Sequence, residues 1–261
     1  TRVRGSLSVA RSSDRTTKRT RRVSTRTGST ERRIAVPIRV HPIMPQQKAD
    51  YADDIEIDDA LDQLPDDETV ESAVTGLEAS GFEVVVVDSA AEALETIQSQ
   101  VPAGVSVMNG HSTTLEEIGF DEFLSEGDHE WESLPDRIWG IDDDAERQTA
   151  RRESQTADYF LGGINAVAQT GELVAADLSG SRIGAYPFAA GNVVIVTGTN
   201  KIVPTLDDAF DRLESVAYPL ENERAQEAYG VESAVAKQLI YRRETEEGRT
   251  TVVLVREQLG Y

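Results

Sequence analysis

Three short runs of apolar, mostly β-branched residues limit this chain to a narrow set of folds. The runs are FEVVVVD (82–88), NVVIVTG (192–198) and TTVVLVRE (250–257). They lack the polar alternation of a strand with one solvated face, and such continuous runs are typical of parallel strands buried on both faces. Parallel neighbours need crossover connections, usually helices, so the runs predict an α/β fold.

The segments between these runs have helical spacing and helix-start signals. Helices are predicted at residues 68–81, 89–101, 114–124 and 205–217, shorter strands at 104–108 and 157–163, and a hairpin at 165–177 that turns at Thr170–Gly171. Capping boxes are predicted from Ser89 with Glu92, Thr114 with Glu117, and Thr205 with Asp208. The alternation of strands and helices predicts a mostly parallel sheet covered by helices on both faces.

Charge divides the chain into two parts. Residues 1–43 carry 12 Lys and Arg against 2 Asp and Glu, a net charge of +10. Residues 44–261 carry 14 against 45, a net charge of −31, and together the two parts give the −21 of the whole chain. Within the acidic part, residues 44–67 form a lead-in whose Asp pairs are expected to lie on a solvated face, and residues 68–261 are predicted to be the folded domain.

The basic segment, residues 1–43, is rich in Arg, Ser and Thr and has little apolar periodicity, so we expect it to be disordered. Three interpretations are open: a basic arm for nucleic acid, a transit peptide, or upstream sequence from a misassigned start with Met44 as the true first residue. The abrupt change of charge at Met44 favours the third.

The composition of the acidic part is typical of a protein from a salt-accumulating halophile; an acidic mesophilic protein is the alternative. A net charge of −31 repels itself at low ionic strength, whereas molar salt shortens the Debye length to roughly 3 Å. The same charge argues against nucleic acid as a partner of this domain. The chain has no Cys and no apolar run near the ~18 residues of a membrane helix, so a soluble, cytoplasmic protein without disulfides is expected.

Two predicted strands end in loops that are rich in small and polar residues. The first loop offers Asn109, Gly110, His111 and Ser112 before a helix, and the second offers Gly198, Asn200 and Lys201. Ligands of open parallel sheets bind beyond the carboxyl ends of the strands, and backbone N–H groups in such loops suit an anion. The alternative for the first loop is a tight turn followed by a helix N-cap.

The stretch GGINAVAQTGELVAADLSGSR, residues 162–182, is short of charge for this chain yet contains four polar residues of interest. They are Asn165, Glu172, Asp177 and Arg182. The stretch is either a buried hairpin with its turns or the wall of a binding site. Turns explain its glycines, but turns alone do not require Asn165, Asp177 and Arg182.

Familiar catalytic and cofactor motifs do not occur in the sequence. The three His residues, His41, His111 and His129, have no metal-pair spacing, so no metal site is predicted. No G-x-S-x-G, Walker loop or strand-linked G-x-G-x-x-G occurs, and no cofactor is expected. The absence of these motifs leaves open whether the chain is an enzyme.

Two consecutive segments carry a resemblance to a known family. They read ADYFLGGINAVAQTGELVAADLSGSRIGA and NVVIVTGTNKIVPTLDDAFDRLESVAYPLENER. Their order of motifs, NA at 165–166, GELV at 171–174, Asp177, Gly180, Arg182 and NKIV at 200–203, closely resembles the LUD domain family, the lactate-utilisation proteins. STTLEEIG and TVVLVREQLGY also resemble family segments, so the resemblance covers roughly residues 81–261 and is densest between 158 and 224.

The resemblance implies a three-layer α/β/α fold like that of ribose-phosphate isomerases, glucosamine-phosphate deaminases and CoA transferases. It also implies a role in the oxidation of lactate to pyruvate beside iron–sulfur partner proteins, with a homo-oligomer as a further option. Two departures from the family are visible. Related chains often carry a Cys-rich segment where residues 225–249 of this chain have none, and LSGSR replaces the more usual GNGNR.

The resemblance implies one of two functional classes. In the first, the domain binds a small anionic metabolite, with Lys201 and Arg182 paired to the anion and with Asn165 and the Gly198 backbone orienting it. In the second, the domain is a non-catalytic subunit that assembles an iron–sulfur lactate-oxidising complex.

An enzyme of the first class would act like a CoA transferase or phosphosugar isomerase on its anionic metabolite. Glu117 or Glu172 would then be the general base or nucleophile, as carboxylates are in CoA transferases of this fold group. The predicted capping box gives Glu117 a second, structural explanation.

The charge of residues 44–261 predicts that folding depends on salt. As KCl falls from molar concentration to about 0.1 M, the Debye length grows to about 10 Å and the carboxylates repel one another more strongly. Circular dichroism should then show loss of structure. An unchanged spectrum and melting temperature at low salt would contradict the halophile interpretation.

Overall fold

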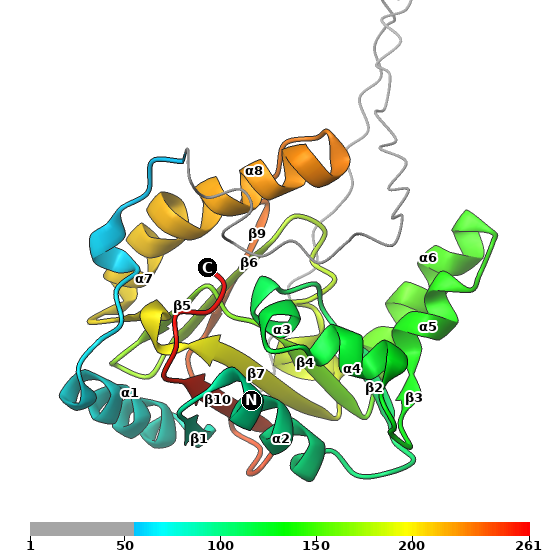
Figure 1. The fold of residues 1–261 in the computed structure, drawn as a ribbon, viewed down its shortest axis with the longest axis horizontal. Helices are drawn as coiled ribbons and strands as arrows, with labels where there is room; N and C mark the ends of the chain where they lie inside the picture. Colours follow the sequence, from blue (N-terminus) through cyan, green and yellow to red (C-terminus); the bar gives the residue numbers. More distant parts are fainter. Residues whose placement is uncertain (1–54) are drawn as a thin grey trace, which may run out of the picture. The chain divides into compact units, whose positions relative to one another are not determined.

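The computed structural model describes residues 55–261. The predictions for residues 1–43 and for the start at Met44 lie outside the described residues. Within 55–261, no helix is both long enough and apolar enough to cross a membrane. This part of the chain contains a six-stranded sheet, a smaller four-stranded sheet and the helices that cover them (Figure 1).

The central sheet is parallel throughout and has the order β1-β10-β7-β4-β2-β3. Its strands are β1 (Glu83–Val87), β2 (Ser106–Asn109), β3 (Glu132–Ser133), β4 (Tyr159–Gly162), β7 (Asn192–Gly198) and β10 (Thr250–Val255). The three apolar runs of the sequence are the neighbours β1, β10 and β7. The predicted parallel sheet is therefore confirmed, and its most apolar strands lie side by side.

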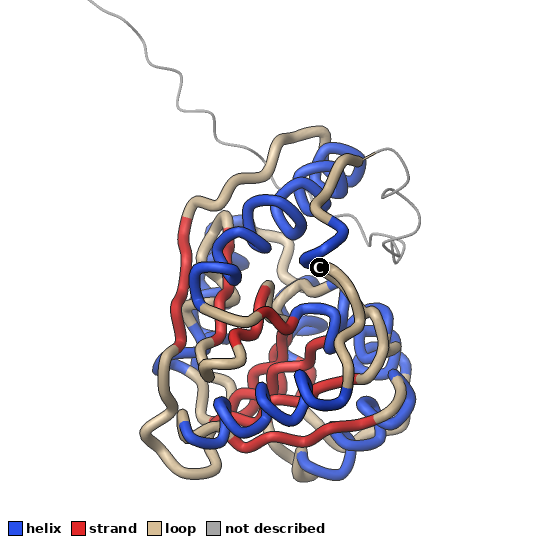
Figure 2. The backbone as a smooth tube through the Cα atoms, turned by 90° about the vertical axis from the view of Figure 1, so that its left-hand side faces the viewer, coloured by secondary structure: helices blue, strands red, loops and turns tan. Residues whose placement is uncertain are grey.

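Side chains of the central strands alternate between two cores. Val193 and Ile195 of β7 pack with α1 (Asp67–Ala79), whereas Val194 and Val196 pack on the opposite face. That face is covered by α2 (Ala90–Gln100), α3 (Thr113–Glu117) and α4 (Phe120–Glu126). Helices α5 (Leu134–Trp139) and α6 (Asp144–Glu153) share a small core beyond β2. Strands thus lie between helical layers, as in the expected three-layer α/β/α fold (Figure 2).

The predicted hairpin is confirmed, but it belongs to the smaller sheet. Strands β5 (Ala166–Ala168) and β6 (Leu173–Asp177) pair antiparallel, and Gly171 takes φ +98° at the turn. The sheet order is β8-β5-β6-β9, with β8 (Ile202–Val203) and β9 (Lys237–Tyr241) at its edges. Because β8 directly follows the loop after β7, that loop connects the two sheets.

The outer face of the smaller sheet packs against one long helical segment. It consists of α7 (Leu206–Arg212), a π-helical segment (Leu213–Ala217) and α8 (Tyr218–Tyr229) in unbroken succession. The predicted helix end at residue 217 is therefore wrong. Pro219 has no N–H for the Ser215 carbonyl four residues before it, and that carbonyl accepts instead from the Asp58 N–H at 3.2 Å. The acidic lead-in is thus anchored to this helix.

Two of the three predicted capping boxes hold at least in part. Thr205 and Asp208 form a complete capping box at α7. At α2, Ser89 Oγ accepts from the Glu92 N–H as expected, but the Glu92 carboxylate accepts from the N–H of Asp88 instead of Ser89.

The capping box predicted from Thr114 and Glu117 is wrong. Ser112 is the N-cap of α3, with its Oγ 3.4 Å from the Leu115 nitrogen. The single helix predicted over 114–124 is also divided, because Gly119 takes φ +77° between α3 and α4. Thr114 and Glu117 are consequently available for other contacts.

Candidate functional site

The loop after β7 places polar residues between the two sheets. Gly198 ends β7, the 3₁₀ turn Thr199–Lys201 follows, and β8 begins at Ile202. Asn200 is 0% exposed and Lys201 is 1% exposed. This is the second of the two strand-end loops expected to bind a ligand, and its side chains point into the protein.

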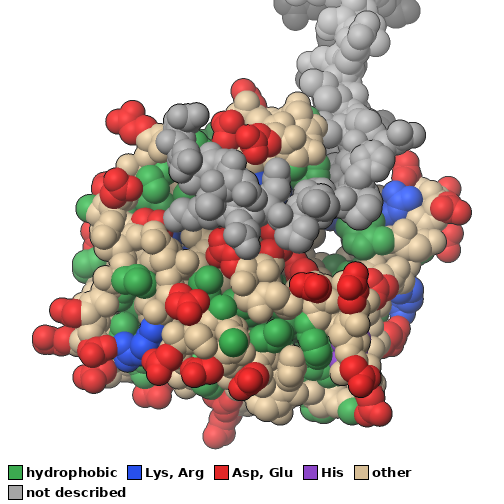
Figure 3. All heavy atoms as spheres, in the orientation of Figure 1, with side chains coloured by type: hydrophobic (Ala, Val, Ile, Leu, Met, Phe, Trp, Pro, Cys, Tyr) green, Lys and Arg blue, Asp and Glu red, His purple; other side chains and the backbone are tan. Residues whose placement is uncertain are grey.

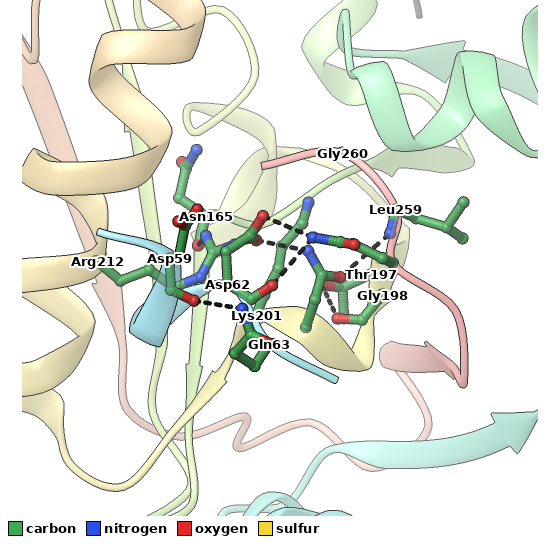
Figure 4. Close-up of polar contacts among 12 residues, drawn as sticks. Asp59, Asp62, Gln63, Asn165, Thr197, Gly198, Lys201, Arg212, Leu259 and Gly260 are labelled. Carbon is green, nitrogen blue, oxygen red and sulfur yellow. Dashed lines mark hydrogen bonds and ion pairs between the residues drawn. The ribbon is translucent and has the colours of Figure 1, made fainter. Parts of the chain in front are cut away.

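Asp62, which the sequence did not single out, joins this loop to α7 and to the segment that follows β10. Its Oδ1 accepts from Arg212 Nη2 at 2.6 Å and from Asn200 Nδ2 at 2.8 Å (Figure 4). Its Oδ2 and its carbonyl accept from Gln258 Nε2 at 2.9 and 3.0 Å. Asp62 is 2% exposed, whereas the described Asp pairs of the lead-in, at 58–59 and 66–67, are exposed as expected. No local pattern separates it from Asp58 and Asp59.

Arg212 is a second residue that sequence reasoning missed. Its guanidinium is 0% exposed and donates to the Asn165 carbonyl as well as to Asp62. Burial lowers the pKa of Arg212 to about 10, although Asp62 favours its charged form. Its Nε–H has no acceptor. Helical spacing assigned Arg212 to α7 but could not reveal its partner 150 residues away.

Lys201 is the buried basic residue of the loop itself. Its Nζ donates to Thr114 Oγ1 at 2.9 Å and to the Ile164 carbonyl at 3.2 Å, and no carboxylate of residues 55–261 forms an ion pair with it. Burial first, and then the charge of Arg212, lower the pKa of Lys201 well below 10.5. The Lys201 side chain is therefore buried between the sheets, and both of its hydrogen-bond acceptors are uncharged oxygens.

Residues 258–261, called the strap below, cover the loop. The Leu259 N–H donates to Asn200 Oδ1 at 3.2 Å, and the Gly260 N–H donates to Glu117 Oε2 at 2.6 Å. Gly260 has φ +55°, and a Cβ there would lie 3.1 Å from Lys201 Nζ and 2.4 Å from Thr114 Oγ1. Figure 1 shows the strap rising from β10 towards α3, and Figure 4 shows Gly260 and Leu259 beside Asp62, Lys201 and Arg212. These three residues are called the Lys201 cluster below, together with Thr114, Glu117 and Asn200.

The close fit of the strap also explains the glycine at the end of β7. A Cβ on Gly198 would lie 2.7 Å from the Leu259 nitrogen and 2.6 Å from the Glu257 carbonyl oxygen. Gly198 has φ −68°, so the need is for space and not for an unusual backbone conformation. Of the expected ligand residues, Gly198 thus contributes close packing under the strap.

The structure separates the two candidate catalytic carboxylates. Glu117 is half-buried, contacts the strap and lies close enough to Lys201 to favour its charged form. Glu172 lies at the turn end of the β5–β6 hairpin, where it accepts from Arg242 at 3.1 Å and from Thr170 at 2.5 Å. Only Glu117 belongs to the Lys201 cluster.

Three polar residues of the stretch 162–182 fix the smaller sheet and its turns. Asn165 Oδ1 accepts from the Ala176 N–H at 2.8 Å. Asp177 accepts from the Gly180 N–H at 2.6 Å and from the Arg182 N–H at 3.1 Å. Burial alone would raise the pKa of Asp177, but the Arg182 charge and these hydrogen bonds bring it below its usual value.

The Arg182 guanidinium, in turn, bridges two strand ends. It donates to the Ala176 carbonyl at 2.6 Å and to the Gly163 carbonyl at 3.4 Å. Its alkyl chain packs on Gly110, where a Cβ would lie 2.7 Å from Arg182 Cγ. Its positive charge still acts on Lys201 and lowers the pKa of that residue.

The loop after β2 forms a separate polar group on α3 and α4. Asn109 Nδ2 donates to Asp121 at 2.6 Å, and His111 Nδ1 lies 3.2 Å from Glu116 Oε1. Burial, reinforced by the charge of Glu116, raises the pKa of Asp121 to about 6. Together with the N-cap Ser112, these contacts favour the alternative of a turn and cap for this loop.

The face of the molecule drawn in Figure 3 is acidic. Asp and Glu side chains are spread over the face shown in Figure 3, whereas Lys and Arg form only isolated spots there. Within 55–261, no group of three or more His, Asp or Glu side chains is arranged to hold a metal ion. The basic side chains of Lys201 and Arg212 are therefore buried inside a domain whose net charge is strongly negative.

Comparison with known proteins gives one family match and a distant structural likeness. A family model described as the LUD domain matches residues 70–255. A solved structure of a DUF162 family protein from Deinococcus radiodurans is similar, with 13% identity and a TM-score of 0.44 over 72% of this chain and 96% of that one. No curated protein matches.

Replacing Asp62 tests its role in the cluster. Asp62→Ala leaves the buried Arg212 guanidinium without its carboxylate, which we expect to lower the free energy of unfolding by about 3–5 kcal/mol. Urea denaturation in molar KCl measures it. Asp59→Ala, at an exposed position of the same lead-in, is the matched control and should change stability by no more than about 0.5 kcal/mol. Equal effects of the two variants would contradict this role.

The lowered pKa of Lys201 has a consequence for stability. Between that lowered pKa and 10.5, the unfolded chain binds a proton at Lys201 that the folded chain does not, so the free energy of unfolding rises with pH. Lys201→Met should remove this contribution, and the exposed Lys237→Met should keep it. Denaturation curves across that pH interval measure the difference. Parallel curves for wild type and Lys201→Met would show that Lys201 keeps its ordinary pKa.

Proposed function

The chain belongs to the LUD domain family, which is associated with lactate utilisation, and on that premise we propose that the Lys201 cluster binds a small carboxylate of the lactate and pyruvate type. The observation that carries the proposal is a pair of buried basic side chains whose capacity for ion pairs and hydrogen bonds is not fully used. Lys201 has no carboxylate partner within 55–261, and the Nε–H of Arg212 has no acceptor. Buried charges and donors are ordinarily satisfied, so the cluster is suited to an anion.

The hydrogen-bond acceptors beside Lys201 suit the hydroxyl group of such a ligand. Asn200 Oδ1 and Glu117 Oε2 accept from N–H groups of the strap. A 2-hydroxy acid carries one hydroxyl donor next to its carboxylate, so it could replace a strap N–H at one acceptor while its carboxylate faces Lys201. The proposal therefore requires the strap to shift when the ligand binds.

In the proposed assembly, the oxidation of lactate uses an iron–sulfur partner protein. Thiolates are the usual ligands of such clusters, and this chain has no Cys. The domain would present or receive the carboxylate while the partner takes the electrons. The proposed setting is the cytoplasm of a halophile, where molar salt screens the acidic surface.

A second candidate function is a CoA-transferase-like reaction at Glu117. The observation in its favour is that Glu117 is not used in a capping box and lies close to Lys201. Incubation with an acyl-CoA would then form a mixed anhydride at Glu117 and free CoA. Attack of the CoA thiolate on the glutamyl carbonyl would release the acyl group as its carboxylate and leave CoA on the Glu117 peptide as a thioester that hydroxylamine removes. The same treatment of Glu117→Gln should leave none, and a peptide that stays unmodified in the wild type would exclude this reaction.

Ligand-dependent thermal stability in molar KCl tests the proposed binding. Lactate and pyruvate should each raise the melting temperature, since a ligand at 100 times its Kd stabilises a protein by about 2.7 kcal/mol. Lys201→Met should abolish the response, whereas the exposed Lys237→Met should retain it. A full response in Lys201→Met would place the ligand elsewhere and contradict the proposal.

A further inference from the structure

We propose that Lys201 is a covalent site for 2-oxo acids, because its buried side chain has the hydrogen bonding of a neutral amine poised to condense with a carbonyl group. This inference rests on the proposed binding of a carboxylate at the same cluster and adds a chemical step to it. The substrate class is a small 2-oxo acid, whose carboxylate lies next to the reacting carbonyl.

The hydrogen-bond count at Nζ supports a neutral amine. An ammonium has three N–H donors, whereas a neutral amine has two donors and one lone pair. Lys201 Nζ makes two hydrogen bonds, to Thr114 Oγ1 and to the Ile164 carbonyl, and both acceptors are uncharged oxygens. With the side chain 1% exposed, Nζ is out of contact with bulk solvent, and the remaining tetrahedral position suits a lone pair.

The electrostatics around Nζ act in the same direction. Burial and the charges of Arg212 and Arg182 lower the pKa of Lys201, while Glu117 and Asp62 oppose that shift without cancelling it. Lysines become nucleophilic when they are desolvated or placed beside other cations. The positive charge of the same two arginines also favours the carboxylate of an incoming 2-oxo acid.

The strap marks where the carbonyl carbon would arrive. A Cβ built on Gly260 would lie 3.1 Å from Nζ, so the strap backbone passes directly over the amine. Hydrogen bonds from Gln258, Leu259 and Gly260 to the cluster and from the Tyr261 hydroxyl to Glu221 hold it there. A ligand that takes over these acceptors displaces the strap and reaches the lone pair.

The proposed step balances without a further reactant. The lone pair of Nζ attacks the carbonyl carbon and forms a C–N bond, and one amine proton passes to the former carbonyl oxygen. The hydroxyl group of the resulting carbinolamine then takes up the second amine proton and leaves as water. The product is an imine between Lys201 and the 2-oxo acid, and hydrolysis reverses the step.

Reductive trapping tests the inference on the full-length protein. The protein is incubated with pyruvate and sodium cyanoborohydride in molar KCl near neutral pH, and the modified lysine is located by peptide mass spectrometry. Lactate, which has no carbonyl, is the matched ligand control. The chain has only four lysines, so the exposed Lys237 serves as an internal control in the same sample. If the pKa of one amine is one unit lower than the pKa of the other, the first amine has about tenfold more of its neutral form.

The expected result is a reduced pyruvate adduct on Lys201, roughly tenfold or more above Lys237, and none with lactate. Adducts equal on Lys201 and Lys237 would overturn the inference, because they would show no special reactivity. Stabilisation by pyruvate without an adduct on Lys201 would also overturn it and would leave the proposed carboxylate binding intact. If pyruvate neither stabilises the protein nor modifies Lys201, both proposals fail.

Discussion

The buried contact between Asp62 and Arg212 connects the elements that form the candidate site. One carboxylate receives Arg212 from α7, Asn200 from the loop between the sheets and Gln258 from the strap. Removing a charged pair from water is costly, and such a pair is tolerated when further hydrogen bonds satisfy its atoms. Asp62 meets that condition through these three segments. The cluster therefore positions the lead-in, the helix and the strap relative to one another.

This arrangement leaves Lys201 chemically distinct from Arg212. Asp62 is shared by Arg212 and two amides, so its charge compensates the guanidinium, whereas the amine a short distance away bonds only to uncharged oxygens. A guanidinium keeps its proton under almost all conditions, but a buried amine can lose it. Asp62 stabilises the packing of α7 by pairing with Arg212, and it therefore does not pair with Lys201. The packing of the fold and the reactivity of Lys201 are linked through this carboxylate.

Sequence periodicity predicted the strands of the central sheet except the short edge strand β3, and it was insufficient for the site. The β-branched runs specify buried parallel strands wherever they occur, and β1, β7 and β10 followed from that rule alone. The loop containing Lys201 was also predicted, because parallel strands bind ligands at that end. Asp62 was missed because its burial depends on Arg212, far along the chain. The role of Glu117 was obscured by a local cap signal that Ser112 in fact supplies.

The acidic surface repels an anionic ligand, whereas the buried basic side chains attract it. At low ionic strength, a domain with a net charge of −31 over residues 44–261 repels an anion at long range. In molar salt, the Debye length of roughly 3 Å confines electrostatic forces to close neighbours, while buried groups are screened much less. The ligand would then respond to Lys201 and Arg212 and hardly to the surface. A buried anion site is therefore compatible with this surface in the salt that the folded domain itself is expected to need.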